Sequence, residues 1–82
     1  MTATTPVVDV ATKTVTHAGK TVTMSPHGDD SYDVLVAGVP VGRVIFSFGA
    51  AAATVEGEGA GQVSEEDLTT IGEAWFAAID EA

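Results

Sequence analysis

Residues 64–82, SEEDLTTIGEAWFAAIDEA, constrain the fold most, because they predict a single amphipathic helix after a long stretch of strand-like sequence. Ser64 suits the N-cap, and the acidic residues that follow it, with Asp67 in a capping-box-like position, favour the positive end of the helix dipole. At about 100° per residue the apolar residues share one stripe, which predicts a helix over about residues 65–81 lying on a sheet. The stripe comprises Leu68, Ile71, Gly72, Trp75, Ala78, Ile79 and Ala82, with Phe76 at its border. We expect Trp75 in the core, and a solvated row of Glu66, Glu73 and Asp80 on the opposite face.

The segment SYDVLVAGVPVGRVIFSF, residues 31–48, predicts a β-hairpin because it is dense in β-branched and aromatic residues. Ala37-Gly38 is the expected turn, which pairs Val36 with Val39. With that register, one face carries Tyr32, Val34, Val36, Val39, Val41, Arg43 and Ile45, and the other carries Asp33, Leu35, Pro40, Gly42, Val44, Phe46 and Phe48. A bulge at Gly42 would shift this assignment.

An earlier hairpin is indicated by the repeated KTVT at residues 13–16 and 20–23. A turn at Ala18-Gly19 would place Val15 opposite Val22, since cross-strand partners sum to a constant. Four threonines then share one face, which we interpret as a solvated sheet surface. A further strand is expected at Ala51–Gly57, after a turn near Gly49-Ala50.

These elements predict an α+β fold, in which sequential hairpins form an antiparallel sheet of four to five strands with one C-terminal helix packed on one face. We expect a disordered N-terminus over residues 1–6 and a single domain over residues 7–82. The expected strands are about 8–17, 20–25, 31–37, 39–48 and 51–56.

Charge and composition argue against several functions. Twelve acidic and three basic residues give a formal charge of −9, which opposes direct binding to nucleic acid or to anionic membranes. The absence of cysteine excludes disulfides and thiolate zinc sites. Neither a secretory signal nor an apolar run long enough for a membrane span is present, so we expect a soluble, cytoplasmic protein.

The stretch SPHGDDSYD, residues 25–33, is the main candidate for chemistry, because His27 lies close to Asp29 and Asp30. These residues could contribute to a metal site, but the other histidine, His17, is expected at the opposite end of a strand. Turn formation is the favoured interpretation. The sequence also lacks a nucleophile elbow and a P-loop lysine. We therefore predict no enzyme activity and no cofactor.

An interaction surface is the favoured functional prediction. One helix covers only one sheet face, whereas the 31–48 hairpin is apolar on both faces in the register above. An uncovered apolar face is typical of an interaction site. The candidate residues are Tyr32, Val34, Val41, Ile45, Phe46 and Phe48. We expect them, or an open edge strand, to bind a protein partner or a second copy of the chain.

The motif YDVLVAGVPVGRV, followed by an alanine-rich strand and a helix containing EAW, resembles small acidic orphan proteins of actinobacteria and their phages. Abundant Ala, Val, Thr and Gly, with no Asn, agree with that origin. The resemblance implies this origin and no chemistry. From it, together with the predicted interaction surface, we expect a phage-encoded accessory protein that binds a host protein in the bacterial cytoplasm. One alternative is an acidic DNA mimic that uses Glu66, Glu73 and Asp80 to inhibit a nucleic-acid-binding protein. Another is a virion structural or decoration protein.

Overall fold

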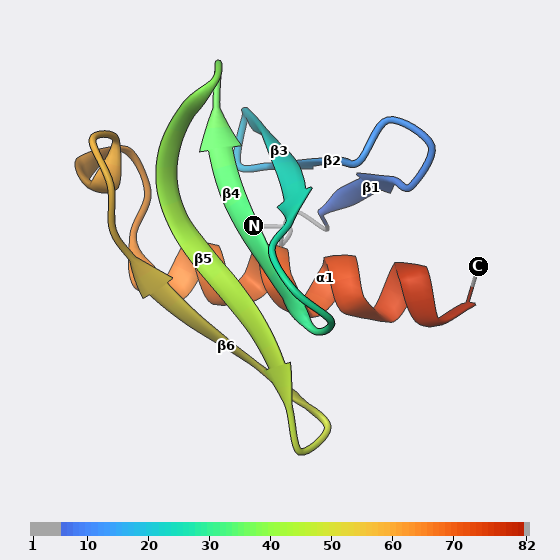
Figure 1. Cartoon of the computed structure of the whole chain (residues 1–82). Coiled ribbons are helices and arrows are strands. Elements are labelled where there is room, and N and C mark those ends of the chain that lie inside the picture. The colour runs from blue at the N-terminus through green and yellow to red at the C-terminus, as the bar shows by residue number, and fades with distance from the viewer. Residues whose placement is uncertain (1–5, 82) are drawn as a thin grey trace.

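The computed structural model describes residues 6–81, without the side chain of Glu81, and the described chain forms an antiparallel sheet with one α-helix packed against it (Figure 1). The strands follow one another in the sheet in sequence order. The elements are β1 (Val7–Asp9), β2 (Thr14–His17), β3 (Lys20–Pro26), β4 (Ser31–Val36), β5 (Val39–Ser47), β6 (Ala50–Val55), the short 3-10 helix η1 (Ala60–Gln62) and α1 (Glu65–Glu81). The α+β class and the single covering helix are therefore confirmed. The segment predicted to be disordered, residues 1–6, lies outside the described residues except for Pro6.

The sheet has six described strands, and the prediction of four to five was wrong because the expected strand 8–17 is interrupted. The interruption is a turn after Asp9, whose Oδ1 accepts hydrogen bonds from the backbone N–H groups of Ala11 and Thr12 at 3.1 and 3.2 Å. Lys13 completes the turn with a φ of 57°. Aspartate commonly stabilises a turn by binding the backbone N–H groups that follow it. The chain therefore folds back, and β1 pairs with β2.

Three hairpin turns share one backbone geometry. In each turn a non-glycine residue with a φ near 50° precedes a glycine with a φ near 80°, the pattern of type I′ turns that match the twist of the sheet. The turns are Ala18-Gly19, Ala37-Gly38 and Phe48-Gly49. The first two were predicted, whereas the third lies one residue before the expected position. The predicted pairs Val15↔Val22 and Val36↔Val39 are confirmed.

A bulge in β5 changes which residues of this strand face the helix. Leu35 pairs with Pro40, but Val34 pairs with Gly42, so Val41 is an extra residue in β5. Beyond the bulge, side chains that the regular register assigned to one face lie on the other. Val44 and Phe46 consequently join Tyr32 and Val34 on the helix side, while Arg43 and Ile45 move to the uncovered side. The two-face assignment of the regular register was therefore wrong for this part of β5, and the stated alternative of a bulge, expected at Gly42, is found at the preceding residue.

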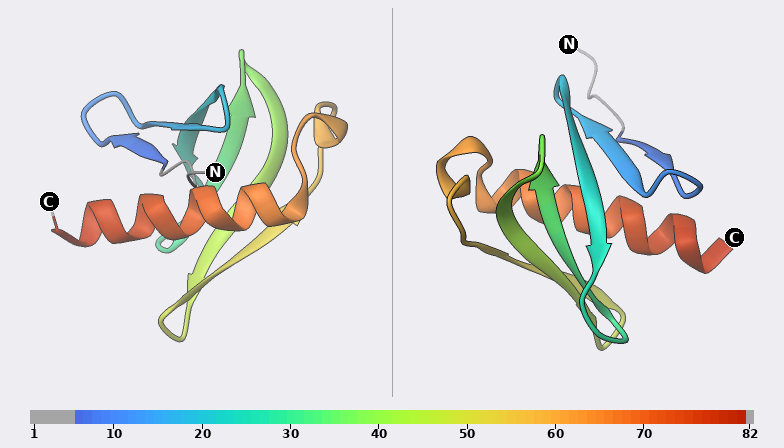
Figure 2. Two further views of the ribbon diagram at one scale, coloured as in Figure 1. Left: turned by 180° about the vertical axis from the view of Figure 1, so that it is seen from behind. Right: turned by 45° about the horizontal axis from the view of Figure 1, so that its top comes forward.

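Helix α1 crosses one face of the sheet and buries its apolar stripe there (Figures 1 and 2). Trp75 is only 1% exposed, and its ring makes an edge contact with Tyr32 at a centroid distance of 5.3 Å, which confirms its predicted core position. Ser64 caps the helix by accepting a hydrogen bond from the backbone N–H of Asp67 at 3.1 Å. At Gly42 the helix approaches so closely that a Cβ would overlap the Leu68 side chain and lie 2.5 Å from the Thr54 carbonyl oxygen.

The uncovered sheet face is largely polar, with Val7 and Ile45 as its exposed large apolar residues. Val15 and Val22 are fully buried beneath the helix, so the threonines that alternate with them point away from it. Thr16 and Thr21 lie opposite each other there, with their hydroxyl oxygens 3.1 Å apart. The threonine face is thus confirmed, and within the described strands the large apolar residues Tyr32, Val34 and Val44 lie on the helix side instead of forming an uncovered apolar face. Within residues 6–81, no helix has the length and apolarity needed to cross a bilayer.

Candidate functional site

The predicted interaction residues are divided between the core and the surface. Val34 and Val41 are fully buried in the core, and Tyr32 is half-buried against Trp75 and Phe76, so these three residues do not provide an open face. Ile45 is 38% exposed on the polar sheet face, while Phe46 is 40% exposed on the helix side. Phe48 is fully exposed. The exposed part of the predicted set therefore lies along the second half of β5 and at the tip of the β5–β6 hairpin.

A groove of about 590 Å³ lies beside this hairpin. Its walls come from the β3–β4 turn, the end of β5 with the start of β6, and the C-terminal half of α1. The lining residues are Asp29, Asp30, Phe46, Gly49, Ala50, Ala51, Glu73, Phe76, Ala77, Ile79 and Asp80. Apart from the acids, the lining consists of apolar residues and glycine, so the groove combines an apolar floor with a charged rim. We call this the acid-rimmed groove.

Two aromatic rings form much of its apolar floor. Phe46 from β5 and Phe76 from α1 have ring centroids 5.2 Å apart, in a tilted arrangement. Phe76 also makes a T-shaped contact with the Tyr32 ring, at a centroid distance of 5.7 Å. Small residues surround the pair, and we attribute the openness of the groove to them. Packing fixes Phe76, which is 7% exposed, whereas Phe46 offers its exposed part to a ligand.

The charged rim consists of four carboxylates, two from the β3–β4 turn and two from α1. Asp29 and Asp30 belong to the β3–β4 turn, where the backbone N–H of Phe46 donates a hydrogen bond to the Asp30 carbonyl oxygen at 2.8 Å. This bond holds the turn against β5. Glu73 and Asp80 belong to α1 and line the groove. Glu66, the third member of the predicted acidic row, is exposed but is not part of the lining.

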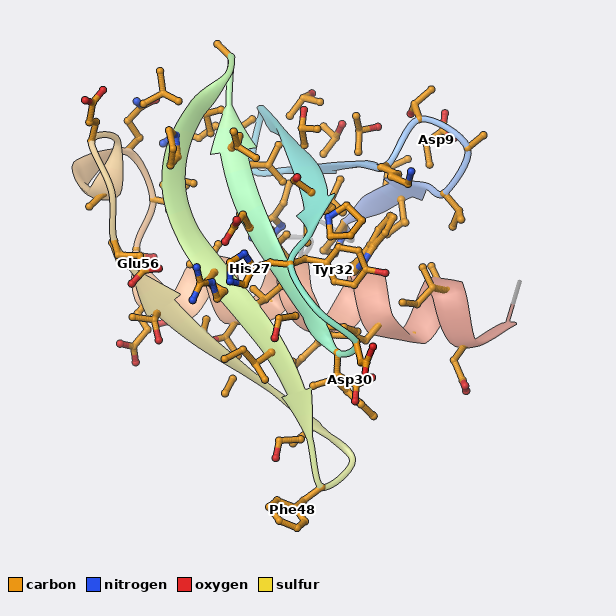
Figure 3. All side chains as sticks on the ribbon, in the orientation of Figure 1. Asp9, His27, Asp30, Tyr32, Phe48 and Glu56 are labelled. Carbon is orange, nitrogen blue, oxygen red and sulfur yellow. The ribbon has the colours of Figure 1, made fainter. Side chains whose placement is uncertain are left out.

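Phe48 projects from the tip of the β5–β6 hairpin, away from the body of the protein (Figure 3). Its backbone has a φ of 53°, a left-handed conformation in which the Cβ of a non-glycine residue is crowded. Gly49, the next residue, already lines the groove. The exposed phenylalanine is thus the immediate sequence neighbour of a residue that lines the acid-rimmed groove.

A second group of charged residues lies on the polar sheet face. Arg43 Nε donates to Asp33 Oδ1 at 2.9 Å, and Asp33 Oδ2 lies 3.4 Å from His27 Nδ1. Glu56 lies on the other side of Arg43, at 3.9 Å from Nη2. The hydrogen bond to Asp33 raises the pKa of Arg43 above its ordinary value, so this guanidinium stays protonated. We interpret the group as an ion-pair network that joins β4 to β5, because it lies on an open sheet face.

The two histidines have separate surroundings. His17 Nε2 lies 3.5 Å from Asp67 Oδ1 at the start of α1, whereas His27 contacts Asp33. Among the described residues, no group of three or more His, Cys, Asp or Glu side chains is placed to hold a metal ion. Asp29 and Asp30, the candidate metal ligands of the sequence, instead form part of the groove rim.

Comparison with known proteins adds no family assignment: no family model matches the chain, and no curated protein or solved structure is similar enough to count as a match.

Proposed function

We propose that the chain is a non-enzymatic protein-binding module. Its docking surface comprises Phe48 at the β5–β6 tip and the adjoining acid-rimmed groove. The observation that carries this proposal is Phe48 itself, a large apolar side chain that is fully exposed on a turn that disfavours it. Aromatic residues of this kind dominate the energetics of protein interfaces.

The other hairpins provide an internal comparison for Phe48. Ala18 and Ala37 occupy the same turn position, with φ values of 51° and 52°, and both are small. Asparagine is the common residue at this position, because its side chain tolerates a positive φ. Phenylalanine is neither small nor tolerant of a positive φ, and the ring of Phe48 is not buried. We infer that it contacts another molecule.

A different protein is a better partner for this surface than a second copy of the chain. Each copy carries a formal charge of −9, and an isologous dimer through the groove would bring like charges together. The actinobacteriophage origin suggested by the composition would place the partner among host proteins. The docking role of Phe48 follows from its exposure and does not depend on the origin of the protein or on the identity of the partner.

A DNA mimic is the second candidate, because Glu66, Glu73 and Asp80 are all exposed along α1. Their spacing of seven residues corresponds to about 10.5 Å per step along a helix. A mimic would use all three carboxylates against a basic cleft. Of these three carboxylates, the docking proposal involves only Glu73 and Asp80, which line the groove. Neutralising Glu66 should therefore weaken binding by a DNA mimic but not binding through the groove.

Photo-cross-linking from the hairpin tip tests the docking function. We expect a protein with benzoylphenylalanine at position 48, expressed in its native host cells, to form a discrete cross-linked product. The matched control carries the same group at position 37, in a turn of the same geometry on a different hairpin. An excess of wild-type protein should suppress the product at position 48, whereas an excess of the Phe48→Asn protein should not.

Two results would argue against this function. Equal products from positions 48 and 37 would indicate that the aromatic photoprobe reacts without a specific site. The absence of any product at position 48, with the cross-linking protein folded and abundant, would remove the proposed role of Phe48.

A further inference from the structure

We infer that the acid-rimmed groove binds a cationic amphipathic segment of a partner protein, in which Lys or Arg residues flank apolar side chains. This inference rests on the proposed docking function and specifies its partner. It follows from three properties of the groove: its apolar floor, its unneutralised rim and the distribution of its charges over two elements.

The floor supplies a site for apolar side chains. The groove volume of about 590 Å³ lies within the range of pockets that enclose most of a bound small molecule. Phe46 leaves 40% of its surface exposed there, beside the fixed ring of Phe76. Apolar side chains of a partner would gain burial against these rings, and a cation placed over the exposed ring of Phe46 would be attracted to its face.

The rim is not neutralised by the basic residues of the chain. Arg43 is held by Asp33 on the opposite sheet face, and Lys20 donates to the Gln62 carbonyl oxygen near η1. Lys13 lies in the β1–β2 turn. Among the described residues, the groove lining includes no Lys or Arg, and none of its four carboxylates belongs to an ion pair. An incoming segment must therefore supply the positive charge.

The placement of the carboxylates specifies the pattern of the segment. Asp29 and Asp30 come from the β3–β4 turn, whereas Glu73 and Asp80 come from α1, and the aromatic rings belong to the same lining. A matching segment therefore presents apolar residues to the rings and basic residues to both sources of carboxylates. Acidic segments are repelled by the same rim, which gives the groove selectivity by charge.

Binding of designed peptides tests the inference. The probe is an amphipathic peptide of about 18 residues, or five helical turns, built from Leu and Lys. One control peptide replaces every Lys by Gln, and the other replaces every Leu by Ser. We expect the Leu/Lys peptide to bind with an affinity that falls as salt is raised, because salt screens exposed charges, and both control peptides to bind at least tenfold more weakly.

Paired variants locate the site. Glu73→Gln with Asp80→Asn removes two carboxylates of the groove, whereas Glu58→Gln with Glu66→Gln removes the same charge elsewhere. We expect the groove variant to weaken Leu/Lys binding by about tenfold, since exposed ion pairs contribute a few-fold each, and the control variant to weaken it less than twofold. Thermal melts of both proteins confirm that they are folded, as the exposed positions predict.

The outcomes separate this inference from the docking function. Equal loss of affinity in the two variants would overturn the inference, because it would indicate nonspecific attraction to an acidic protein. Equal binding of the Leu/Gln peptide would overturn the requirement for positive charge. Failure of the Leu/Lys peptide, with cross-linking at position 48 intact, would overturn the cationic partner and leave the docking function in place.

Discussion

Replacing Trp75 by alanine is expected to lower the free energy of unfolding by about 3–5 kcal/mol, because the indole fills the space between α1 and the sheet. A chain of this length has a total stability of only about 4–12 kcal/mol, so much of the protein would be near its unfolding threshold. Trp75 is 1% exposed and contacts the edge of the Tyr32 ring, which also supports Phe76 at the groove floor. Urea denaturation measures this loss directly.

Trp75→Phe is the matched control for this prediction. It keeps an aromatic ring against Tyr32 and removes the indole N–H, which has no hydrogen-bond acceptor among the described residues. We expect a loss of about 1–2 kcal/mol, since a smaller void is partly offset by removal of an unsatisfied buried donor. A loss below 1 kcal/mol for Trp75→Ala would contradict the packing of α1 on the sheet.

Replacing Phe48 by asparagine is expected to separate stability from binding. The folded protein should gain about 0.5–1 kcal/mol, because asparagine tolerates the positive φ of the turn, and its melting temperature should rise by about 2–8 °C. Affinity for the partner that cross-links at position 48 should fall by about thirtyfold, the loss of an interface residue that contributes 2 kcal/mol. Calorimetry measures both quantities on the same protein.

Ala37→Asn provides the control for this second prediction. Its turn has the same backbone geometry and lies on another hairpin, so it should gain similar stability while partner affinity stays within twofold of the wild type. Unchanged partner affinity in Phe48→Asn would mean that the exposed phenylalanine serves no docking role. A drop in stability would mean that its ring supports the fold instead.

The sequence predicted the local elements and much of the register. Turn chemistry at Ala18-Gly19 and Ala37-Gly38 positions the neighbouring strands, and helical periodicity places Trp75 in the core. The break between β1 and β2 was missed because Val10 and the threonines around it favour a strand. Only the side chain of Asp9, which binds two backbone N–H groups, indicated a turn.

The candidate site was predicted only in part. Phe46 and Phe48 were identified from the sequence. The bulge at Val41, however, places Val44 and Phe46 on the helix side. The alternation of side chains between the two faces of a strand does not show where an extra residue lies. The acid-rimmed groove brings Asp29 and Asp30 of the β3–β4 turn into one lining with residues of α1 that lie more than forty residues further along the chain. Asp29 and Asp30 were therefore interpreted as turn residues, with a metal site as the less favoured alternative. The Phe46–Asp30 backbone hydrogen bond, which holds them at the rim, has no sequence signature.

Two-dimensional NMR of the isotope-labelled protein, titrated with the Leu/Lys peptide, tests the docking surface most directly. The account predicts that the largest shifts occur at the backbone amides of Phe46, Gly49 and Phe76 and at the Asp29–Asp30 turn, with the threonine face little changed. Saturable shifts centred on Thr16, Thr21 and Arg43, with the groove amides unchanged, would contradict it.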